Sequence, residues 1–179
     1  MHGGVLVRPR LPRFMARTAL RTSAAWVMLA YRLPREPSTP RITVWRRLKR
    51  LGVAQLSDGL VALPFDSRTL EALEWIAEEV TEAGGDATIW IGEPASRDQA
   101  RALATRMAGA ISDEYARVID DALSAQASEP HLRRRTVARL RRELQRIRRR
   151  DYFPPAAREQ AETAVEQLAA MSDAQVVTA

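Results

Sequence analysis

Short apolar runs in residues 25–91 indicate four β-strands. Residues 25–33 (AWVMLAYRL) are mostly apolar and end at a proline, which predicts a buried strand. Two short predicted strands, VAQL (53–56) and LVAL (60–63), flank Ser57-Asp58-Gly59, a sequence typical of a hairpin turn. Residues 87–91 (ATIWI) predict a fourth strand.

Helical periodicity separates these strands. Thr39 is expected to cap a helix that has Pro40 at its first position, runs to Leu51 and stops at Gly52. Residues 67–83 repeat apolar side chains at helical spacing before a Gly-Gly pair. The expected order is β-α-β-β-α-β, which is the order of a ferredoxin-like domain, here residues 24–94.

Three further helices are expected, at about 97–127, 130–150 and 155–171. Ser96 and Gln99 form a capping-box pattern before the first of them. The middle helix has a narrow apolar seam, which predicts an antiparallel hairpin with the helix before it; the seam residues are Leu132, Val137, Leu140, Leu144 and Ile147.

The predicted fold class is α+β: a ferredoxin-like βαββαβ unit followed by three C-terminal helices. Residues 1–23 are expected to be a basic disordered arm, residues 95–171 a helical appendage that packs on the ferredoxin-like domain, and residues 172–179 a frayed tail. Strands 25–33 and 87–91 carry apolar side chains on both faces. The open face of the sheet must therefore be covered, and we expect the C-terminal helices to cover it and a homodimer to form in addition.

The composition argues against several classes of chemistry. The 179 residues include no cysteine, which excludes disulfides and thiolate metal sites and fits a reducing cytoplasm. His2 and His131 lie far apart, and no glycine-rich phosphate loop or Ser/His/Asp arrangement is present. No apolar run approaches the length of a membrane span. We expect no enzymatic activity, no metal and no cofactor.

Charge is distributed in alternating blocks. Residues 1–50 carry net +11, residues 51–130 net −10, residues 131–150 net +9 and residues 151–179 net −4, which leaves +6 for the whole chain. Basic blocks are the usual electrostatic feature of a protein that binds a polyanion. Blocks of opposite sign can equally pair with one another inside one molecule.

The first basic cluster lies on the helix expected at 40–51. On a helical wheel the apolar side chains share one arc and the basic ones lie opposite. The basic side chains can contact phosphate, or they can be a solvated face that glutamates of the neighbouring helix neutralise. The candidate DNA contacts are Arg41, Arg46, Arg47, Lys49 and Arg50.

The second basic cluster, residues 133–150, has ten arginines in eighteen residues. The preceding helix offers Asp113, Glu114, Asp120 and Asp121 as partners, and four carboxylates leave excess positive charge. The alternatives are again polyanion binding and a solvated face. The candidate DNA contacts are Arg133, Arg134, Arg141 and Arg142. Trp45, Trp75 and Trp90 have spacings that favour the core or an interface over base stacking.

Three blocks in order carry a family resemblance: LPREPSTPRITVWRRLKRLGVAQLSDGLVALP, ALEWIAEEVTEAGGDATIWIG and RRRDYFPPAAREQAETAVEQL. They resemble the N-terminal domain of the ChrB family of chromate-resistance transcriptional regulators, over about residues 24–171. The resemblance implies a bacterial regulator of a chromate efflux operon. Members of this family usually continue into a second domain that is assigned to oxyanion sensing. The alternatives for this chain are a stand-alone N-terminal module whose partner domain is encoded beside it, and a truncated relative.

A looser resemblance links the first strand, helix and hairpin to phenylacetate-type repressors and to small ferredoxin-like CRISPR nucleases. In those nucleases an aspartate at the end of the first strand binds metal, whereas this chain has Ala30-Tyr31-Arg32. The resemblance therefore does not extend to nuclease activity.

Three hypotheses about function follow. The first is a non-enzymatic regulatory module that binds DNA, or assists a DNA-binding partner, through arginine and lysine contacts to phosphate. The second is a dimerising scaffold that binds only protein. The third makes helix 40–51 and hairpin 53–63 a winged-helix domain, and the strands expected at 25–33 and 87–91 argue against it.

Overall fold

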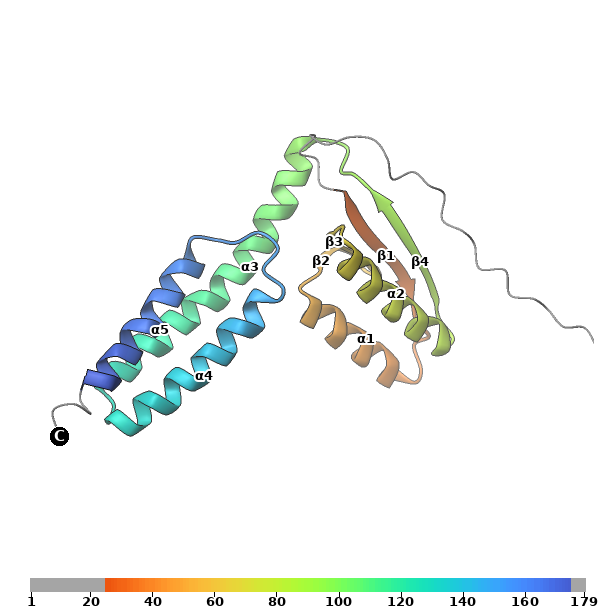
Figure 1. Cartoon of the computed structure of the whole chain (residues 1–179). Helices are drawn as coiled ribbons and strands as arrows, with labels where there is room; N and C mark the ends of the chain where they lie inside the picture. The colour runs from red at the N-terminus through yellow and green to blue at the C-terminus, as the bar shows by residue number, and fades with distance from the viewer. Residues whose placement is uncertain (1–24, 175–179) are drawn as a thin grey trace, which may run out of the picture.

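The computed structural model describes residues 25–174, which form a four-stranded antiparallel sheet and five α-helices (Figure 1). The α+β class is therefore confirmed, and expectations about residues 1–24 and 175–179 lie outside the described residues. The strands are β1 (Trp26–Arg32), β2 (Ala54–Ser57), β3 (Leu60–Pro64) and β4 (Asp86–Gly92). The helices are α1 (Ser38–Leu51), α2 (Ser67–Glu82), α3 (Arg97–Ser124), α4 (Pro130–Arg148) and α5 (Ala157–Ala174).

The strand order in the sheet is β2-β3-β1-β4. β1 is a central strand, and Leu29 at its middle is in register with Val61 of β3 and Ile89 of β4. The expectation that the first and last strands are neighbours is confirmed. Within residues 25–174, β2 and β4 are the two edges of the sheet.

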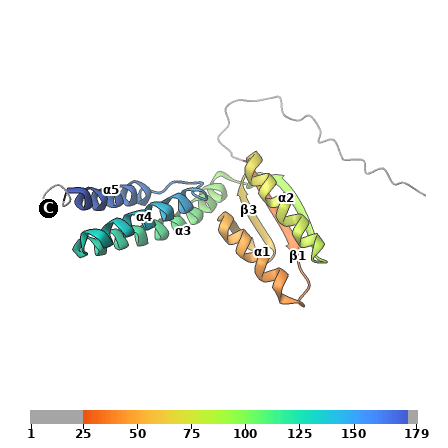
Figure 2. The same cartoon turned by 60° about the horizontal axis from the view of Figure 1, so that its bottom comes forward.

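One face of the sheet packs under α1 and α2, which lie side by side in both views (Figures 1 and 2). Val27 and Leu29 of β1, Val44 of α1 and Leu73 of α2 are all fully buried. These residues belong to one continuous apolar core. Burial of apolar stripes from both helices is the main stabilising contribution to this part of the fold.

The opposite face of the sheet is covered only in part. Alternation along a strand places Trp26 and Met28 on this face, and Met28 is in register with Trp90 of β4. Trp26 is buried, and its ring stacks on Phe153 at 5.9 Å between ring centroids. Trp90 is 60% exposed on this face, whereas Ile91, which is in register with Val27 and so belongs to the other face, is 54% exposed. The expected cover by the C-terminal helices therefore reaches the start of β1 and leaves β4 open.

Helices α3, α4 and α5 form a second unit beside the sheet, with its own apolar core (Figure 2). The seam predicted for α4 is buried at Val137, Leu140, Leu144 and Ile147, whereas Leu132 is exposed. Tyr115 of α3 is fully buried in this core. Within the part of the chain that the structure describes, no helix is long and apolar enough to cross a membrane.

The two units meet where α1 ends and where α4 leads into α5. The Tyr152 hydroxyl donates a hydrogen bond to the Leu51 carbonyl at 3.0 Å, and the Arg68 guanidinium donates to the Arg149 carbonyl at 3.0 Å. Gly52 lies so close to Arg150 that a Cβ atom on the glycine would be 3.0 Å from the arginine Cβ. We call this contact between Leu51–Gly52 and residues 149–153 the junction.

Helix boundaries differ from the sequence expectation at a few points. α1 begins at Ser38 after Pro37, and no side chain caps it, so Thr39 is not its cap. α3 ends at Ser124, where a short 3₁₀ helix (Ala125–Ala127) takes over. α5 continues to Ala174, so residues 172–174 are helical rather than part of a frayed tail.

Asp66 caps α2, which sequence reasoning did not anticipate. Its carboxylate accepts a hydrogen bond of 2.6 Å from the Thr69 backbone N–H, and the Thr69 hydroxyl accepts one of 2.9 Å from the Asp66 backbone N–H. The Thr69 backbone N–H, as the main cause, lowers the pKa of Asp66 below its ordinary value. The cap is therefore fully formed at neutral pH and weakens when acid protonates the carboxylate.

Replacing Asp66 with alanine is expected to lower the free energy of unfolding by about 1 kcal/mol. The parent should lose stability as the pH falls below the ordinary aspartate range, and the Asp66→Asn variant should lose less over that interval. Urea unfolding at pH 7 and at pH 3 measures both effects. Equal acid sensitivity in the parent and in Asp66→Asn would contradict this role for the carboxylate.

Candidate nucleic-acid interface

Helix α1 separates its apolar and basic side chains. Val44 and Leu48 are buried against the sheet, while Arg46, Lys49 and Arg50 are exposed. Lys49 and Arg50 lie in the last turn, where positive charge also interacts favourably with the helix dipole. The solvent-facing arc predicted from the helical wheel is therefore present as a basic surface.

The neighbouring helix neutralises little of this surface. Arg47 forms an ion pair of 3.0 Å with Glu79 of α2. Among residues 25–174, Arg46 and Arg50 form no ion pair, although α2 carries four other glutamates. The ammonium of Lys49 lies 4.2 Å from the centroid of the Trp45 ring. Glu79 therefore neutralises Arg47, whereas the charges of Arg46, Lys49 and Arg50 remain exposed on α1.

On α4, several arginines are paired with acidic residues of all three helices. Arg139 pairs with Asp121 of α3 at 2.8 Å, and Arg141 makes a two-pronged contact with Glu166 of α5, the shorter bond being 2.9 Å. The further pairs are Arg146 with Glu143, Arg148 with Glu162 and, just beyond the end of α4, Arg150 with Glu114. Arg141, a candidate DNA contact, therefore has an intramolecular partner.

Arg133 is a correction to the sequence expectation. It was expected at the surface, but it is only 5% exposed and lies in register with the apolar seam at Val137 and Leu140. Its guanidinium donates a hydrogen bond of 2.9 Å to the carbonyl of Gln126. The side chain thereby ties the start of α4 to the end of the preceding 3₁₀ helix, and it is not available to a polyanion.

Four exposed arginines of the second cluster have no ion pair with any residue in the described range 25–174: Arg134, Arg135, Arg142 and Arg149. The spacing of seven from Arg135 to Arg142 to Arg149 places three of them on one line along the helix face opposite the seam. α4 therefore presents a basic stripe to solvent that intramolecular pairing does not cancel.

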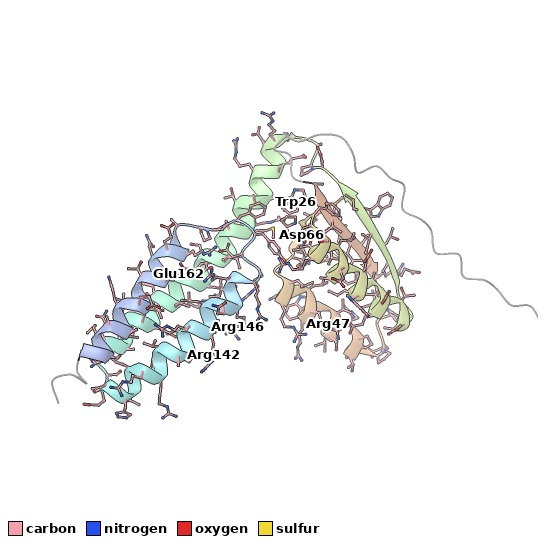
Figure 3. All side chains as sticks on the ribbon, viewed as in Figure 1. Trp26, Arg47, Asp66, Arg142, Arg146 and Glu162 are labelled. Atoms are coloured by element: carbon pink, nitrogen blue, oxygen red, sulfur yellow. The ribbon has the colours of Figure 1, made fainter. Side chains whose placement is uncertain are left out.

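The junction brings the two basic clusters together. Tyr152 and Leu51 are joined by a hydrogen bond across 101 positions of sequence, so the last turn of α1 lies beside the end of α4. Figure 3 shows Arg142 and Arg146 on α4 and Arg47 on α1, with Arg146 toward the end of α4 that approaches α1. We define the junction surface as Arg46, Lys49, Arg50, Arg142 and Arg149.

An open groove of about 770 Å³ runs along α4 and α5 beside this surface. Its lining includes Arg142, Arg146, Arg148 and Arg149 together with Glu162. Arg41 lines a second groove, which starts at the N-terminal end of α1 and reaches Arg46, and Arg134 lies at the far end of α4 from the junction. The nine sequence candidates are therefore not one site, and the structure divides them between the two ends of each helix.

Sequence reasoning omitted Arg149 from the candidate contacts. The sequence did contain a pattern that indicates it, because Arg149 continues the seven-residue spacing of Arg135 and Arg142. No sequence signal showed that this position would lie next to α1. Within the described residues, no three His, Asp or Glu side chains gather in a way that could hold a metal ion.

Comparison with known proteins gives two matches. The family model described as "Protein ChrB, N-terminal" matches residues 41–176. The chain is 30% identical over 142 residues to "Protein ChrB" of Cupriavidus metallidurans, an alignment that covers 77% of this chain and 43% of the relative. The chain thus spans less than half the length of that curated relative. No solved structure matches this chain.

Proposed function

Because this chain belongs to the family of ChrB N-terminal domains, we propose that it is a non-enzymatic regulatory module of chromate resistance that binds DNA through its junction surface. The regulatory role rests on family membership, and the DNA surface rests on the residues of α1 and α4. We further propose that the chain acts in the cytoplasm, together with a separate protein that carries an oxyanion-sensing domain.

The mechanism is phosphate contact by cationic side chains. Each arginine or lysine that meets a phosphate releases a condensed counterion, and this release supplies affinity that does not depend on base sequence. Contacts of this kind position a protein on the duplex and carry no sequence information. Selection of an operator would then come from a partner, or from residues beyond this surface.

One observation carries the proposal: two arginine clusters from separate parts of the sequence meet at the junction, and their outward side chains form no ion pair within the described residues. An isolated exposed arginine is an ordinary surface feature. Five cationic side chains gathered from two helices, with no ion pair among residues 25–174, make a field strong enough to attract a polyanion.

Binding of the chain to a fluorescently labelled duplex, measured by fluorescence anisotropy at about 0.1 M salt, tests the proposal. The DNA-binding hypothesis expects saturable binding to duplexes of unrelated sequence with similar affinity. The protein-only hypothesis expects no binding at this salt concentration. Absence of binding even at low salt would reject the proposal.

A dimer is a second, compatible proposal, and a specific feature favours it. β4 pairs only with β1 among the described residues, so one backbone edge of its seven residues is open. Trp90 and Ile91 on this strand are the large exposed apolar side chains beside that edge. An open, apolar edge strand pairs readily with another copy of itself.

Light scattering at tens of micromolar is expected to give the mass of a dimer for the parent. The Trp90→Asp, Ile91→Asp variant should be monomeric, because it places charge in the buried interface. Trp75→Asp is the matched control, since Trp75 is 63% exposed on α2, away from this edge. A strictly monomeric parent would reject the dimer.

We also propose that the sheet with α1 and α2 is a ferredoxin-like domain over residues 24–94, with residues 95–171 as a helical appendage. The element order β1-α1-β2-β3-α2-β4 and the central position of β1 and β3 support this assignment. The separate apolar core of α3–α5 supports the division into two units.

A further inference from the structure

A second groove starts at the other end of the sheet from the junction, where β1 ends and α1 begins, and extends along α1 as far as Arg46. It is open and encloses about 1150 Å³. This size is comparable with pockets that hold small organic ligands. Its lining comes from the end of β1, the first turns of α1, the β2–β3 turn and the start of β4.

Two glycines fix the walls of this groove. A Cβ atom at Gly59 would lie 2.4 Å from the Tyr31 carbonyl oxygen, and one at Gly85 would lie 2.3 Å from the Arg32 carbonyl oxygen. Gly59 also has a φ of +74°, which other residues rarely adopt. The β2–β3 turn and the start of β4 can therefore both close against the end of β1, and the groove has a defined shape.

The charge of the groove favours an anion. Four arginines line it, namely Arg32, Arg35, Arg41 and Arg46, and none of them forms an ion pair within residues 25–174. Asp58 and Asp86 are the two carboxylates in the lining, so the net charge is positive. α1 also starts here with no side-chain cap and no acidic residue in its first turn, which leaves the positive end of its dipole open.

Aromatic side chains accompany these charges. Trp45 is 49% exposed, lines the groove and lies beside the ammonium of Lys49. Tyr31 is half-buried in the lining; burial and the nearby Asp58 carboxylate raise its pKa, and Arg41 acts in the opposite direction. A bare phosphate would use the arginines and leave the Trp45 ring unused. A ligand with both a phosphate and a planar ring would use both.

We propose that this groove binds a nucleoside phosphate, with the phosphate held by Arg32, Arg35 and the start of α1, and the base against Trp45. Stacking on an aromatic side chain next to a cationic groove is a general way to hold nucleotides. The ligand can be a free nucleotide or one unpaired residue of a nucleic-acid strand, since the chemistry is the same. Arg46 belongs both to this groove and to the junction surface, whereas Arg32 and Arg35 belong to the groove alone, so replacing these two tests the groove separately from the junction surface.

Isothermal titration calorimetry with three probes tests the proposal: ATP, a 5′-phosphorylated single strand of four thymidines, and inorganic phosphate. We expect ATP or the oligonucleotide to bind more tightly than inorganic phosphate. Arg32→Gln, Arg35→Gln should weaken that binding at least tenfold. Trp45→Leu should weaken nucleotide binding and leave phosphate binding unchanged. Tighter binding of ATP assigns the site to a free nucleotide, and tighter binding of the oligonucleotide assigns it to a strand.

The matched control is Arg97→Ala, Arg117→Ala, which removes two exposed charges from α3 away from the groove. This variant should bind as the parent does, and circular dichroism confirms that every variant is folded. The proposal is overturned if no probe binds at millimolar concentration or if the Arg32, Arg35 variant binds as the parent does. Equal loss of ATP and phosphate binding in Trp45→Leu would overturn the assignment to a nucleotide.

Discussion

Replacing Leu140 with alanine is expected to lower the free energy of unfolding by about 2–5 kcal/mol. Leu140 lies in the middle of the α4 seam and is 1% exposed in the core that α3, α4 and α5 share. The substitution removes three buried carbons and leaves a cavity that helices packed on either side can fill only in part.

Arg142→Ala is the matched control for Leu140→Ala. Arg142 lies two positions along the same helix, is exposed and has no ion pair with residues 25–174, so its loss should change the free energy of unfolding by less than about 0.5 kcal/mol. Urea unfolding of the parent and both variants makes the comparison. Similar losses for the two variants would mean that α4 does not bury its seam.

The division of α4 into a buried apolar seam and an exposed basic face is also the structural feature that the sequence predicted best. Helical periodicity placed Val137, Leu140, Leu144 and Ile147 on one side of α4, and all four are buried. Strand and turn patterns likewise located the four strands and the pairing of β1 with β4. Such patterns can be recognised within a single segment, because a helix or strand that buries one face repeats its apolar residues at a fixed interval along the sequence.

The start of α1 shows a limit of local signals. Pro40 at the first helical position was expected, yet the helix begins at Ser38 with Pro37 at its cap. The first backbone N–H groups of a helix have no intrahelical partner, so prolines near the start lose no hydrogen bond there. Several registers of this segment were therefore compatible with the same proline spacing.

Arg133 shows how tertiary contacts override a residue's usual preference. Its spacing of four from Val137 placed it on the seam, but its charge indicated an exposed position. The carbonyl of Gln126, in a 3₁₀ helix that the sequence did not reveal, accepts a hydrogen bond from the buried guanidinium and so offsets part of the cost of burying its charge. Such a partner can be identified only after the connection between α3 and α4 is known.

The candidate site was predictable in its parts but not as a whole. Both basic clusters were evident from the sequence, and so was the excess of arginine over carboxylate. Their meeting at the junction depends on the contact between Tyr152 and Leu51, which no local pattern encodes. The glutamates of α5 that pair with Arg141 and Arg148 were missed for the same reason.

Removing the cationic side chains of the junction surface is expected to reduce the affinity for DNA and its dependence on salt. Replacing Arg46, Lys49 and Arg50 with alanine should flatten the slope of log K against log salt by about 2–3 units, and replacing Arg142 and Arg149 should flatten it by about 2, given roughly 0.9 per lost phosphate contact. At about 0.1 M salt the loss of all five contacts corresponds to a fall in affinity of at least about a thousandfold.

Folding should survive these substitutions. All five side chains point to solvent, and alanine is the strongest helix former. Affinity should fall similarly on duplexes of different sequence, because phosphate contacts carry no base information. Arg97→Ala, Arg117→Ala removes two charges from α3 and controls for the change in net charge. Its slope should remain close to that of the parent.

The salt dependence of duplex binding by the Arg142→Ala, Arg149→Ala variant distinguishes one DNA surface shared by α1 and α4 from two independent basic clusters. These two arginines come from the C-terminal cluster: Arg149 lies at the junction with the last turn of α1, and Arg142 lies about two turns before it along α4. If the two clusters form one DNA surface, this variant binds the same short duplex with a slope about two units flatter than the parent, and the α1 triple variant shows its own loss on that duplex. A folded Arg142→Ala, Arg149→Ala variant whose slope equals that of the parent would contradict the account.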